Sequence, residues 1–143
     1  MEFRLNRILC VEDDENICQM MKCLLKMWHY EVVVVQTAAA GFSLAKDEHF
    51  DLCLLDSNLP DESGISLCKR ICNLHKHAPV IFISGYAREE DKLRGLKAGA
   101  LAYLTKPVDF DLLEKTMARI IAATPCECCR TVASYETQWK EGA

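Results

Sequence analysis

The chain has 143 residues, of which 50% are hydrophobic and 27% are charged, and its formal net charge is -4. This composition indicates one globular domain and argues against disorder and against nucleic-acid binding through a basic surface. No apolar run approaches the roughly 20 residues of a membrane-spanning helix, and the charged start at residues 1–7 lacks a secretion signal, so we expect a cytoplasmic protein without membrane contact.

Strand-like and helix-like segments alternate along the chain. Short apolar or valine-rich runs predict strands at residues 7–11, 31–36, 51–55, 80–83 and 101–105. Apolar residues at spacings of three and four predict helices within 17–28, 37–45, 65–72, 88–98 and 109–121. We expect Thr37 and Asp109 to cap the second and fifth helices and Gly99 to end the fourth. One face of the fifth helix should carry Phe110, Leu113, Met117, Ile120 and Ile121.

Continuous apolar strands are typical of sheets that are buried on both faces. The pattern therefore predicts an α/β fold, a single doubly wound domain of five βα repeats with a central parallel sheet. In such sheets, functional sites form just beyond the carboxyl ends of the strands. That rule identifies the residues that could act together.

Polar side chains follow four of the predicted strands. Glu12, Asp13 and Asp14 follow the first strand, and Asp56 follows the third. Carboxylates crowded at one sheet edge need a cation, and hard oxygen ligands favour Mg²⁺. A carboxylate beside that ion could attack a phosphoryl group and form an acyl phosphate. Asp14 lies one position later, at the start of the first helix, where it could serve as a cap.

Positive charge and hydrogen-bond donors are available around this acidic group. Lys106 follows the fifth strand and could pair with a transferring phosphoryl group, while the Ser84 hydroxyl, at the end of the fourth strand, could donate to it. Backbone amides near Asn58 could add further donors. The four strand ends together therefore indicate phosphoryl chemistry.

Four motifs occur in an order and at spacings that resemble the receiver domain of bacterial two-component response regulators. The gaps are 43 residues from Asp13 to Asp56, 28 from there to Ser84 and 22 more to Lys106. The motifs are Ile8-Leu9-Cys10-Val11-Glu12-Asp13-Asp14-Glu15, Leu54-Leu55-Asp56-Ser57-Asn58-Leu59-Pro60 with Gly64, Ile83-Ser84-Gly85, and Tyr103-Leu104-Thr105-Lys106-Pro107. The resemblance implies the flavodoxin-like strand order 2-1-3-4-5 and a receiver domain over residues 1–123.

The resemblance implies a role for each acidic position. Asp56 matches the residue that accepts the phosphoryl group. Glu12 and Asp13 match the acidic pair that holds Mg²⁺, Asp13 directly and Glu12 through water. Asp56 and the backbone carbonyl of Asn58 would complete the protein ligands of the ion.

The remaining matches imply a conformational switch. Ser84 matches the hydroxyl that turns toward the phosphoryl oxygen, and Lys106 the lysine that pairs with it. Tyr103 matches the aromatic residue that swings inward when the hydroxyl moves, and Pro107 matches a cis-proline. The surface of the fourth helix, fifth strand and fifth helix would then change its partners, and this surface could also form a homodimer.

The resemblance also implies the partners. A sensor histidine kinase or a phosphotransfer protein would donate the phosphoryl group, and an effector domain or protein would read the result. The domain would promote its own phosphorylation and slow dephosphorylation without being a metabolic enzyme. Two alternatives remain. A haloacid-dehalogenase-type phosphatase would need an acid two residues after the nucleophile, where Asn58 stands, and a flavodoxin would need a phosphate-cradling first loop instead of residues 12–15.

The nine cysteines do not suggest a disulfide framework. Cys10 and Cys53 lie within predicted strands, so we expect them to be buried and reduced. Cys18 and Cys23 fall off the apolar stripe of the first helix, so we expect them to be exposed.

After residue 123 the alternating pattern stops. Residues 124–143 look like a linker or tail, and they contain Cys126, Cys128 and Cys129 without an obvious fourth zinc ligand. Two arrangements stay open: a receiver that acts alone by binding a partner, or one cut from a longer regulator or hybrid kinase.

Overall fold

The computed structural model describes residues 5–75 and 78–123. Strands and helices alternate along the chain as the sequence predicts. The elements are β1 (Arg7–Val11), α1 (Glu15–Met27), β2 (Glu31–Val35), α2 (Ala38–Asp47), β3 (Leu52–Leu55), α3 (Gly64–Leu74), β4 (Val80–Ser84), α4 (Glu89–Lys97), β5 (Ala102–Thr105) and α5 (Phe110–Ala123). None of these helices is long and apolar enough to cross a membrane.

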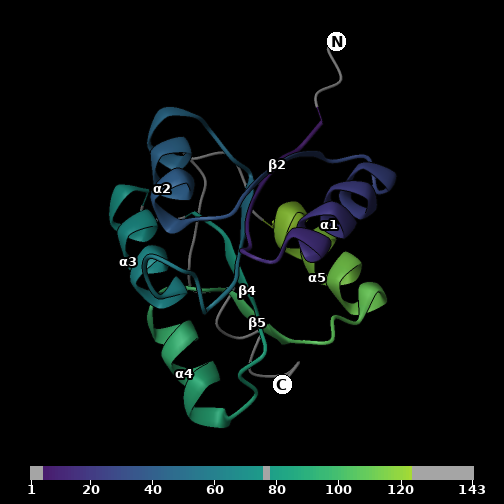
Figure 1. The fold of residues 1–143 in the computed structure, drawn as a ribbon. Helices are drawn as coiled ribbons and strands as arrows, with labels where there is room; N and C mark the ends of the chain where they lie inside the picture. The colour runs from purple at the N-terminus through teal and green to yellow at the C-terminus, as the bar shows by residue number, and fades with distance from the viewer. Residues whose placement is uncertain (1–4, 76–77, 124–143) are drawn as a thin grey trace.

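The five strands form one parallel sheet in the order β2-β1-β3-β4-β5. Both the α/β fold class and the strand order predicted from the sequence are therefore confirmed. In Figure 1, α1 and α5 lie on one side of the sheet, and α2, α3 and α4 lie on the other. The chain moves to opposite faces after β1 and after β3, although these two strands are neighbours.

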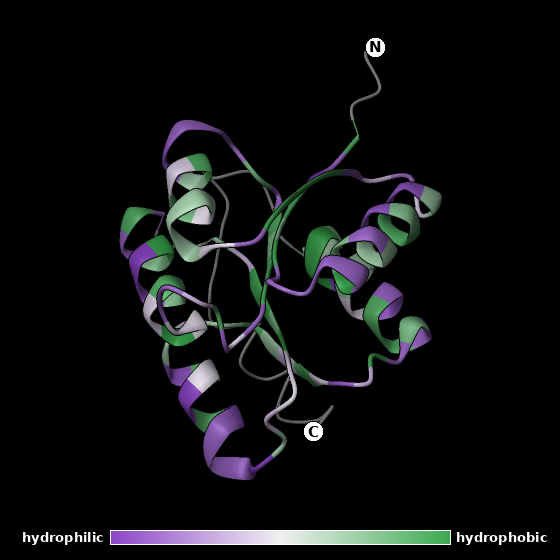
Figure 2. Cartoon of the chain, viewed as in Figure 1, coloured by the Kyte–Doolittle hydropathy of each residue, from purple (hydrophilic) through white to green (hydrophobic). Residues whose placement is uncertain are grey.

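Alternate residues of each strand pack on opposite faces of the sheet, because successive side chains in a strand point to opposite sides. In β1, Leu9 and Val11 belong to the core beneath α2 and α3, whereas Ile8 and Cys10 belong to the core beneath α1 and α5. Figure 2 shows the central strands as a largely hydrophobic layer between helices with mixed faces. Two buried layers thus hold the strand ends in fixed positions.

The helix ends predicted from Asp14, Thr37 and Gly99 are confirmed. The Asp14 side chain accepts hydrogen bonds from the backbone N–H groups of Asn16 and Ile17. Thr37 caps α2. Gly99 follows α4 with φ of 116°, a left-handed conformation that glycine adopts without steric strain.

One prediction of side-chain exposure is wrong. Cys18 is only 3% exposed, because the first turn of α1 lies over the end of β1, where the Cys18 Sγ contacts the backbone oxygen of Glu12 at 3.0 Å. On the apolar face of α5, Leu113 and Met117 are buried, whereas Phe110, the first residue of the helix, is 41% exposed. Cys10 and Cys53 are buried and Cys23 is exposed, as predicted.

The structure leaves the last segment untested. Residues 124–143, with Cys126, Cys128 and Cys129, lie outside the described residues. The interpretation of this segment as a linker or tail remains a prediction, as does the domain boundary at residue 123.

Candidate functional site

The candidate site lies at the carboxyl ends of β1 and β3. These strands are adjacent in the sheet, and Val11 pairs with Leu55. Because α1 and α3 leave toward opposite faces, the two loops diverge, and this is the position at which open α/β sheets bind ligands. Glu12 and Asp13 follow Val11, and Asp56 follows Leu55.

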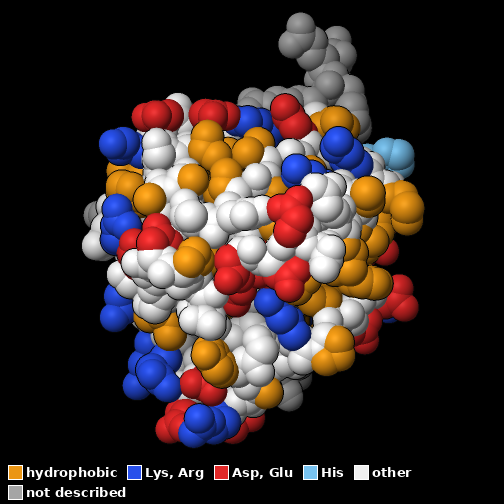
Figure 3. All heavy atoms as spheres, viewed as in Figure 1, with side chains coloured by type: hydrophobic (Ala, Val, Ile, Leu, Met, Phe, Trp, Pro, Cys, Tyr) orange, Lys and Arg blue, Asp and Glu red, His pale blue; other side chains and the backbone are white. Residues whose placement is uncertain are grey.

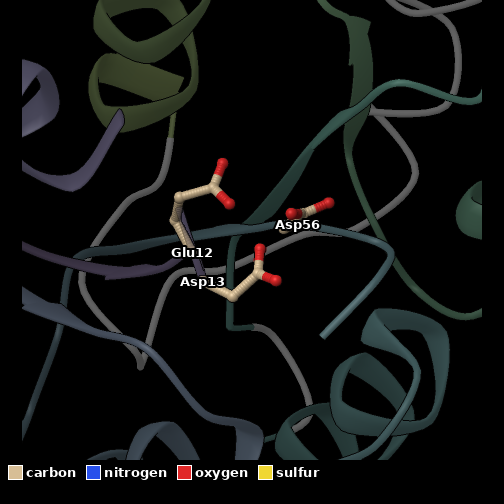
Figure 4. Close-up of side chains that lie close together, drawn as sticks. All are labelled: Glu12, Asp13 and Asp56. Atoms are coloured by element: carbon tan, nitrogen blue, oxygen red, sulfur yellow. The ribbon is translucent and has the colours of Figure 1, made fainter. Parts of the chain in front are cut away.

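Three carboxylates from these strand ends face one another. Glu12, Asp13 and Asp56 each offer an oxygen, and these atoms all lie within 4.8 Å of one another. Figure 4 shows the three side chains converging from the two strand ends. Glu12 and Asp56 are buried, at 4% and 6% exposure, whereas Asp13 reaches solvent. The group therefore has a buried floor and an open side.

Lys106 places a positive charge on this acidic group. Its Nζ lies 2.7 Å from Glu12 Oε1 and 3.4 Å from Asp56 Oδ2. Burial acts to lower the pKa of Lys106, but the hydrogen bond to Glu12 and the charges of Asp56 and Glu12 outweigh burial and raise the pKa. Lys106 therefore keeps its positive charge between two nearly buried carboxylates.

Glu12 is held in an environment that resists its ionisation. Burial, strengthened by the adjacent Asp56 carboxyl, raises the pKa of Glu12 to about 7, although Lys106 opposes the shift. The three carboxylates together carry more negative charge than Lys106 alone can balance. A bound cation would reduce the repulsion among them. Figure 3 shows acidic side chains gathered near the middle of this face with a basic side chain beside them.

The donor set fits Mg²⁺. This ion prefers oxygen ligands at about 2.0–2.1 Å, so two oxygens on opposite sides of it are about 4 Å apart. The carboxylate oxygens already lie within 4.8 Å of one another, and small side-chain rotations would bring them to the ligand distance. The exposed side of Asp13 leaves room for the waters that Mg²⁺ keeps.

The loop after β3 is tied down beside the site. Asn58 donates its backbone N–H to Asp56 Oδ1 at 3.1 Å, which fixes the turn that carries the Asn58 carbonyl. Further along, the Asp61 carboxylate accepts the backbone N–H groups of Ala38 and Ala39, both at 2.9 Å, at the start of α2. These hydrogen bonds lower the pKa of Asp61 and anchor the loop at its far end.

Ser84 is fully buried at the end of β4. Its hydroxyl accepts the backbone N–H of Tyr86 at 3.0 Å and hydrogen-bonds to the Ser57 hydroxyl. Ser84 does not cap the helix that follows, because Arg88 holds the N-cap position of α4. Reasoning from the sequence did not identify Ser57 as a partner. The sequence shows only that a second serine, Ser57, directly follows Asp56, and not that its hydroxyl would reach Ser84.

Tyr103 connects the end of β4 to the packing under α4. Its hydroxyl donates to the Tyr86 carbonyl oxygen at 2.7 Å, and its ring packs against Phe82 with 5.8 Å between centroids. Gly95 of α4 comes so close that a Cβ there would lie 2.8 Å from the Tyr103 ring. Beyond β5, the Lys106–Pro107 peptide bond is cis.

We expect Gly64→Ala to destabilise the protein by about 1–3 kcal/mol through steric overlap. A Cβ at Gly64 would lie 2.7 Å from the Ser57 Cα and 2.9 Å from the Asp56 carbonyl carbon, both in the backbone of the site loop. Backbone atoms cannot rotate away as a side chain can, so the loop itself must shift. Urea unfolding of both proteins measures the loss.

Gly85→Ala is the matched control for this prediction. Gly85 follows Ser84 in the neighbouring loop, yet no heavy atom lies within 4 Å of a Cβ built there. We expect its free energy of unfolding to stay within about 0.5 kcal/mol of the original. Equal losses in the two variants would show that general loop rigidity, and not the contact with Asp56, explains the effect.

Comparison with known protein families and with solved structures points to the same kind of domain. The family model for the response regulator receiver domain matches residues 8–118. The receiver domain protein (CheY-like) of Methanospirillum hungatei JF-1 shares 39% sequence identity and a TM-score of 0.77, over 82% of this chain and 94% of that one. The likeness therefore extends over nearly the whole of that solved receiver domain.

Curated relatives are longer. The transcriptional regulatory protein ZraR of Escherichia coli (strain K12) is 35% identical over 132 residues, which are 92% of this chain but 30% of that protein. The cell cycle response regulator CtrA of Brucella ovis is 39% identical over 116 residues, 81% of this chain and 49% of that protein. The chain thus spans less than half the length of these relatives.

Proposed function

Because this chain belongs to the response regulator receiver domain family, we propose that it is a signalling switch that accepts a phosphoryl group on Asp56. The observation that carries the proposal is the convergence of Glu12, Asp13 and Asp56 beside Lys106 at the ends of adjacent strands. The donor would be a phosphohistidine on a sensor histidine kinase or a phosphotransfer protein, and the site would work in the cytoplasm.

Asp56 is the proposed nucleophile. An oxygen of its carboxylate attacks the phosphorus, an O–P bond forms, and the P–N bond to the donor histidine breaks. The leaving imidazole keeps the bonding electron pair and takes up a proton. Later attack by water on the phosphorus releases inorganic phosphate and restores the Asp56 carboxylate.

The surrounding residues stabilise the charge that builds up on the transferring group. Lys106, which in this structure contacts Glu12 and Asp56, would turn its ammonium group to a phosphoryl oxygen. Glu12, Asp13, Asp56 and the Asn58 carbonyl are the proposed ligands of Mg²⁺. The ion would supply charge neutralisation between the carboxylates and the phosphoryl oxygens.

The proposed output runs through Ser84 and Tyr103. Donation of the Ser84 hydroxyl to a phosphoryl oxygen would alter the loop at Tyr86, whose carbonyl holds the Tyr103 hydroxyl. Tyr103 packs against α4 at Gly95, so its movement would change the surface of α4, β5 and α5. A ligand that binds one conformation better shifts the population toward it. An effector domain, an effector protein or a second copy of the chain would read that surface.

The relatives' names suggest what such an output could be. ZraR is described as a transcriptional regulatory protein and CtrA as a cell cycle response regulator. We propose that this domain likewise controls an effector, without contacting nucleic acid itself. The net charge of -4 supports that separation of roles.

Intact-mass measurement after incubation with acetyl phosphate tests the proposal. We expect one phosphoryl adduct in the presence of Mg²⁺ and none when a chelator removes the ion. A parallel assay with a generic phosphate ester separates this function from a phosphatase, because a receiver should release no phosphate from the ester. Failure to form an adduct with any small donor, or steady ester turnover, would contradict the proposal.

A further inference from the structure

The Ser57 and Ser84 hydroxyls meet between two neighbouring strand ends. β3 and β4 are paired so that Leu55 lies opposite Phe82, and Ser57 and Ser84 each come two residues later. The parallel register therefore brings the two side chains to the same level of the sheet. Their oxygen atoms form a hydrogen bond in which either could be the donor.

The hydrogen-bonding capacity of Ser84 shows which direction this bond takes. A serine hydroxyl has one proton to donate and two lone pairs. The Tyr86 backbone N–H, at 3.0 Å, already uses one lone pair of the Ser84 oxygen. Within residues 5–75 and 78–123, the Ser57 oxygen is the only acceptor within hydrogen-bond distance for the Ser84 proton. Because Ser84 has no solvent exposure, water does not offer an alternative.

Asp56 does not compete for this proton in the structure. Its Oδ1 accepts the Asn58 backbone N–H at 3.1 Å, and its Oδ2 faces the Lys106 ammonium at 3.4 Å. Ser57 forms no other side-chain hydrogen bond among the described residues, and its backbone oxygen is occupied by the Gly64 N–H at 2.9 Å. The Ser57 hydroxyl oxygen is therefore free to accept a hydrogen bond from the Ser84 hydroxyl.

We propose that Ser57 is a positioning residue that holds the Ser84 proton in the unphosphorylated domain and so sets how readily the switch turns on. This inference rests on the proposed function, because it needs Ser84 to donate to a phosphoryl oxygen on Asp56. Without the phosphoryl group, the Ser84 proton bonds to Ser57. With the phosphoryl group in place, the Ser84 hydroxyl instead donates to the charged phosphoryl oxygen, and its hydrogen bond to Ser57 is lost.

This exchange of hydrogen-bond acceptors predicts how loss of the Ser57 hydroxyl changes the affinity for a phosphoryl mimic. Loss of the Ser57 hydroxyl leaves a buried donor unsatisfied in the resting state only, because in the activated state the phosphoryl oxygen accepts that proton. The resting state rises in free energy relative to the activated state, and the population shifts toward the activated state. A phosphoryl mimic should therefore bind Ser57→Ala about 3- to 10-fold more tightly than the original chain.

Calorimetric titration of the full chain with beryllofluoride in excess Mg²⁺ tests this inference. The variants are Ser57→Ala, Ser57→Thr and Ser66→Ala. Ser57→Thr keeps a hydroxyl and should restore the original affinity. Ser66→Ala removes a hydroxyl from α3 that donates to Glu62 at 2.7 Å and not to any carboxylate of the site, and it should leave the affinity unchanged.

The backbone amide of Tyr86 gives a second readout. Its N–H donates to Ser84, so its proton chemical shift in Mg²⁺-free protein should change in Ser57→Ala and return in Ser57→Thr. A purely structural role for Ser57 would lower stability in urea without tightening the binding of beryllofluoride.

The outcomes separate the two proposals. Weaker or unchanged binding by Ser57→Ala, while the original chain binds beryllofluoride, would overturn the role of Ser57 alone. Absence of Mg²⁺-dependent binding by the original chain would overturn the proposed function itself. Tighter binding that Ser57→Thr also shows would overturn the hydrogen-bond explanation, since the hydroxyl is still present in that variant.

Discussion

Asp56→Asn is expected to abolish phosphoryl uptake from acetyl phosphate while leaving the fold intact. The asparagine amide is a far weaker nucleophile than a carboxylate, so the acyl phosphate cannot form. The amide has nearly the same shape, and its oxygen can still accept the Asn58 backbone N–H that now binds Asp56 at 3.1 Å. Intact-mass measurement in Mg²⁺ should show no adduct.

The fold of Asp56→Asn should survive because the substitution also removes one charge from a crowded acidic group. Glu12 and Asp13 then repel one fewer neighbour, which offsets the lost attraction between Asp56 and Lys106 at 3.4 Å. We expect the free energy of unfolding in Mg²⁺-free buffer to change by no more than about 1 kcal/mol.

Asp47→Asn is the matched control for this variant. Asp47 is exposed at the end of α2, which leads to the amino-terminal edge of the sheet and not to the carboxyl ends of β1 and β3, so the same chemical change there should leave the adduct yield unaltered. An adduct at the original level in Asp56→Asn would place the acceptor elsewhere. Global unfolding of that variant would mean that Asp56 has a structural role that the site geometry does not explain.

Lys106→Ala should reduce the rate of phosphorylation by about 10²–10³-fold, the loss typical of removing one preorganised group that stabilises transition-state charge. Its effect on Mg²⁺ affinity should be much smaller, below about 10-fold. Lys106 pairs with Glu12 and Asp56 in this structure, so it competes with a cation for the same oxygens as well as balancing their charge. Single-turnover mass measurements and a Mg²⁺ titration provide the two numbers.

Lys115→Ala provides the control for that experiment. Lys115 is exposed on α5, and its loss changes the net charge by the same amount without touching the carboxylates. Both the phosphorylation rate and the Mg²⁺ affinity should match the original chain. A Lys106→Ala variant that loses Mg²⁺ affinity more than it loses rate would contradict the division of roles between the lysine and the ion.

The sequence predicts the fold well because each level of the pattern agrees with the others. The continuous apolar run of β1 requires burial on both faces, and the alternation of Ile8, Leu9, Cys10 and Val11 between two cores fulfils it. Gly99 ends α4 where expected. The strand order depends on the resemblance to a known family, since periodicity alone does not say which strands pair.

The errors concern features that depend on three-dimensional register. The burial of Cys18 could not be predicted from the apolar stripe of α1, because it comes from the first turn of α1 lying over the end of β1. The contact between Ser57 and Ser84 depends on the pairing of β3 with β4, which places residues 27 positions apart at the same level. Chain order shows that both follow strands, but not that they meet.

The central claim is that the phosphoryl group resides on Asp56, and chemical trapping tests it most directly. Borohydride reduces an acyl phosphate to an alcohol, so brief exposure to acetyl phosphate and Mg²⁺, followed by borohydride and peptide mapping, should convert residue 56 to homoserine. The conversion should require Mg²⁺ and should occur at no other aspartate or glutamate. Modification at a different residue, or an unmodified Asp56 in protein that carries a phosphoryl adduct by mass, would contradict the account.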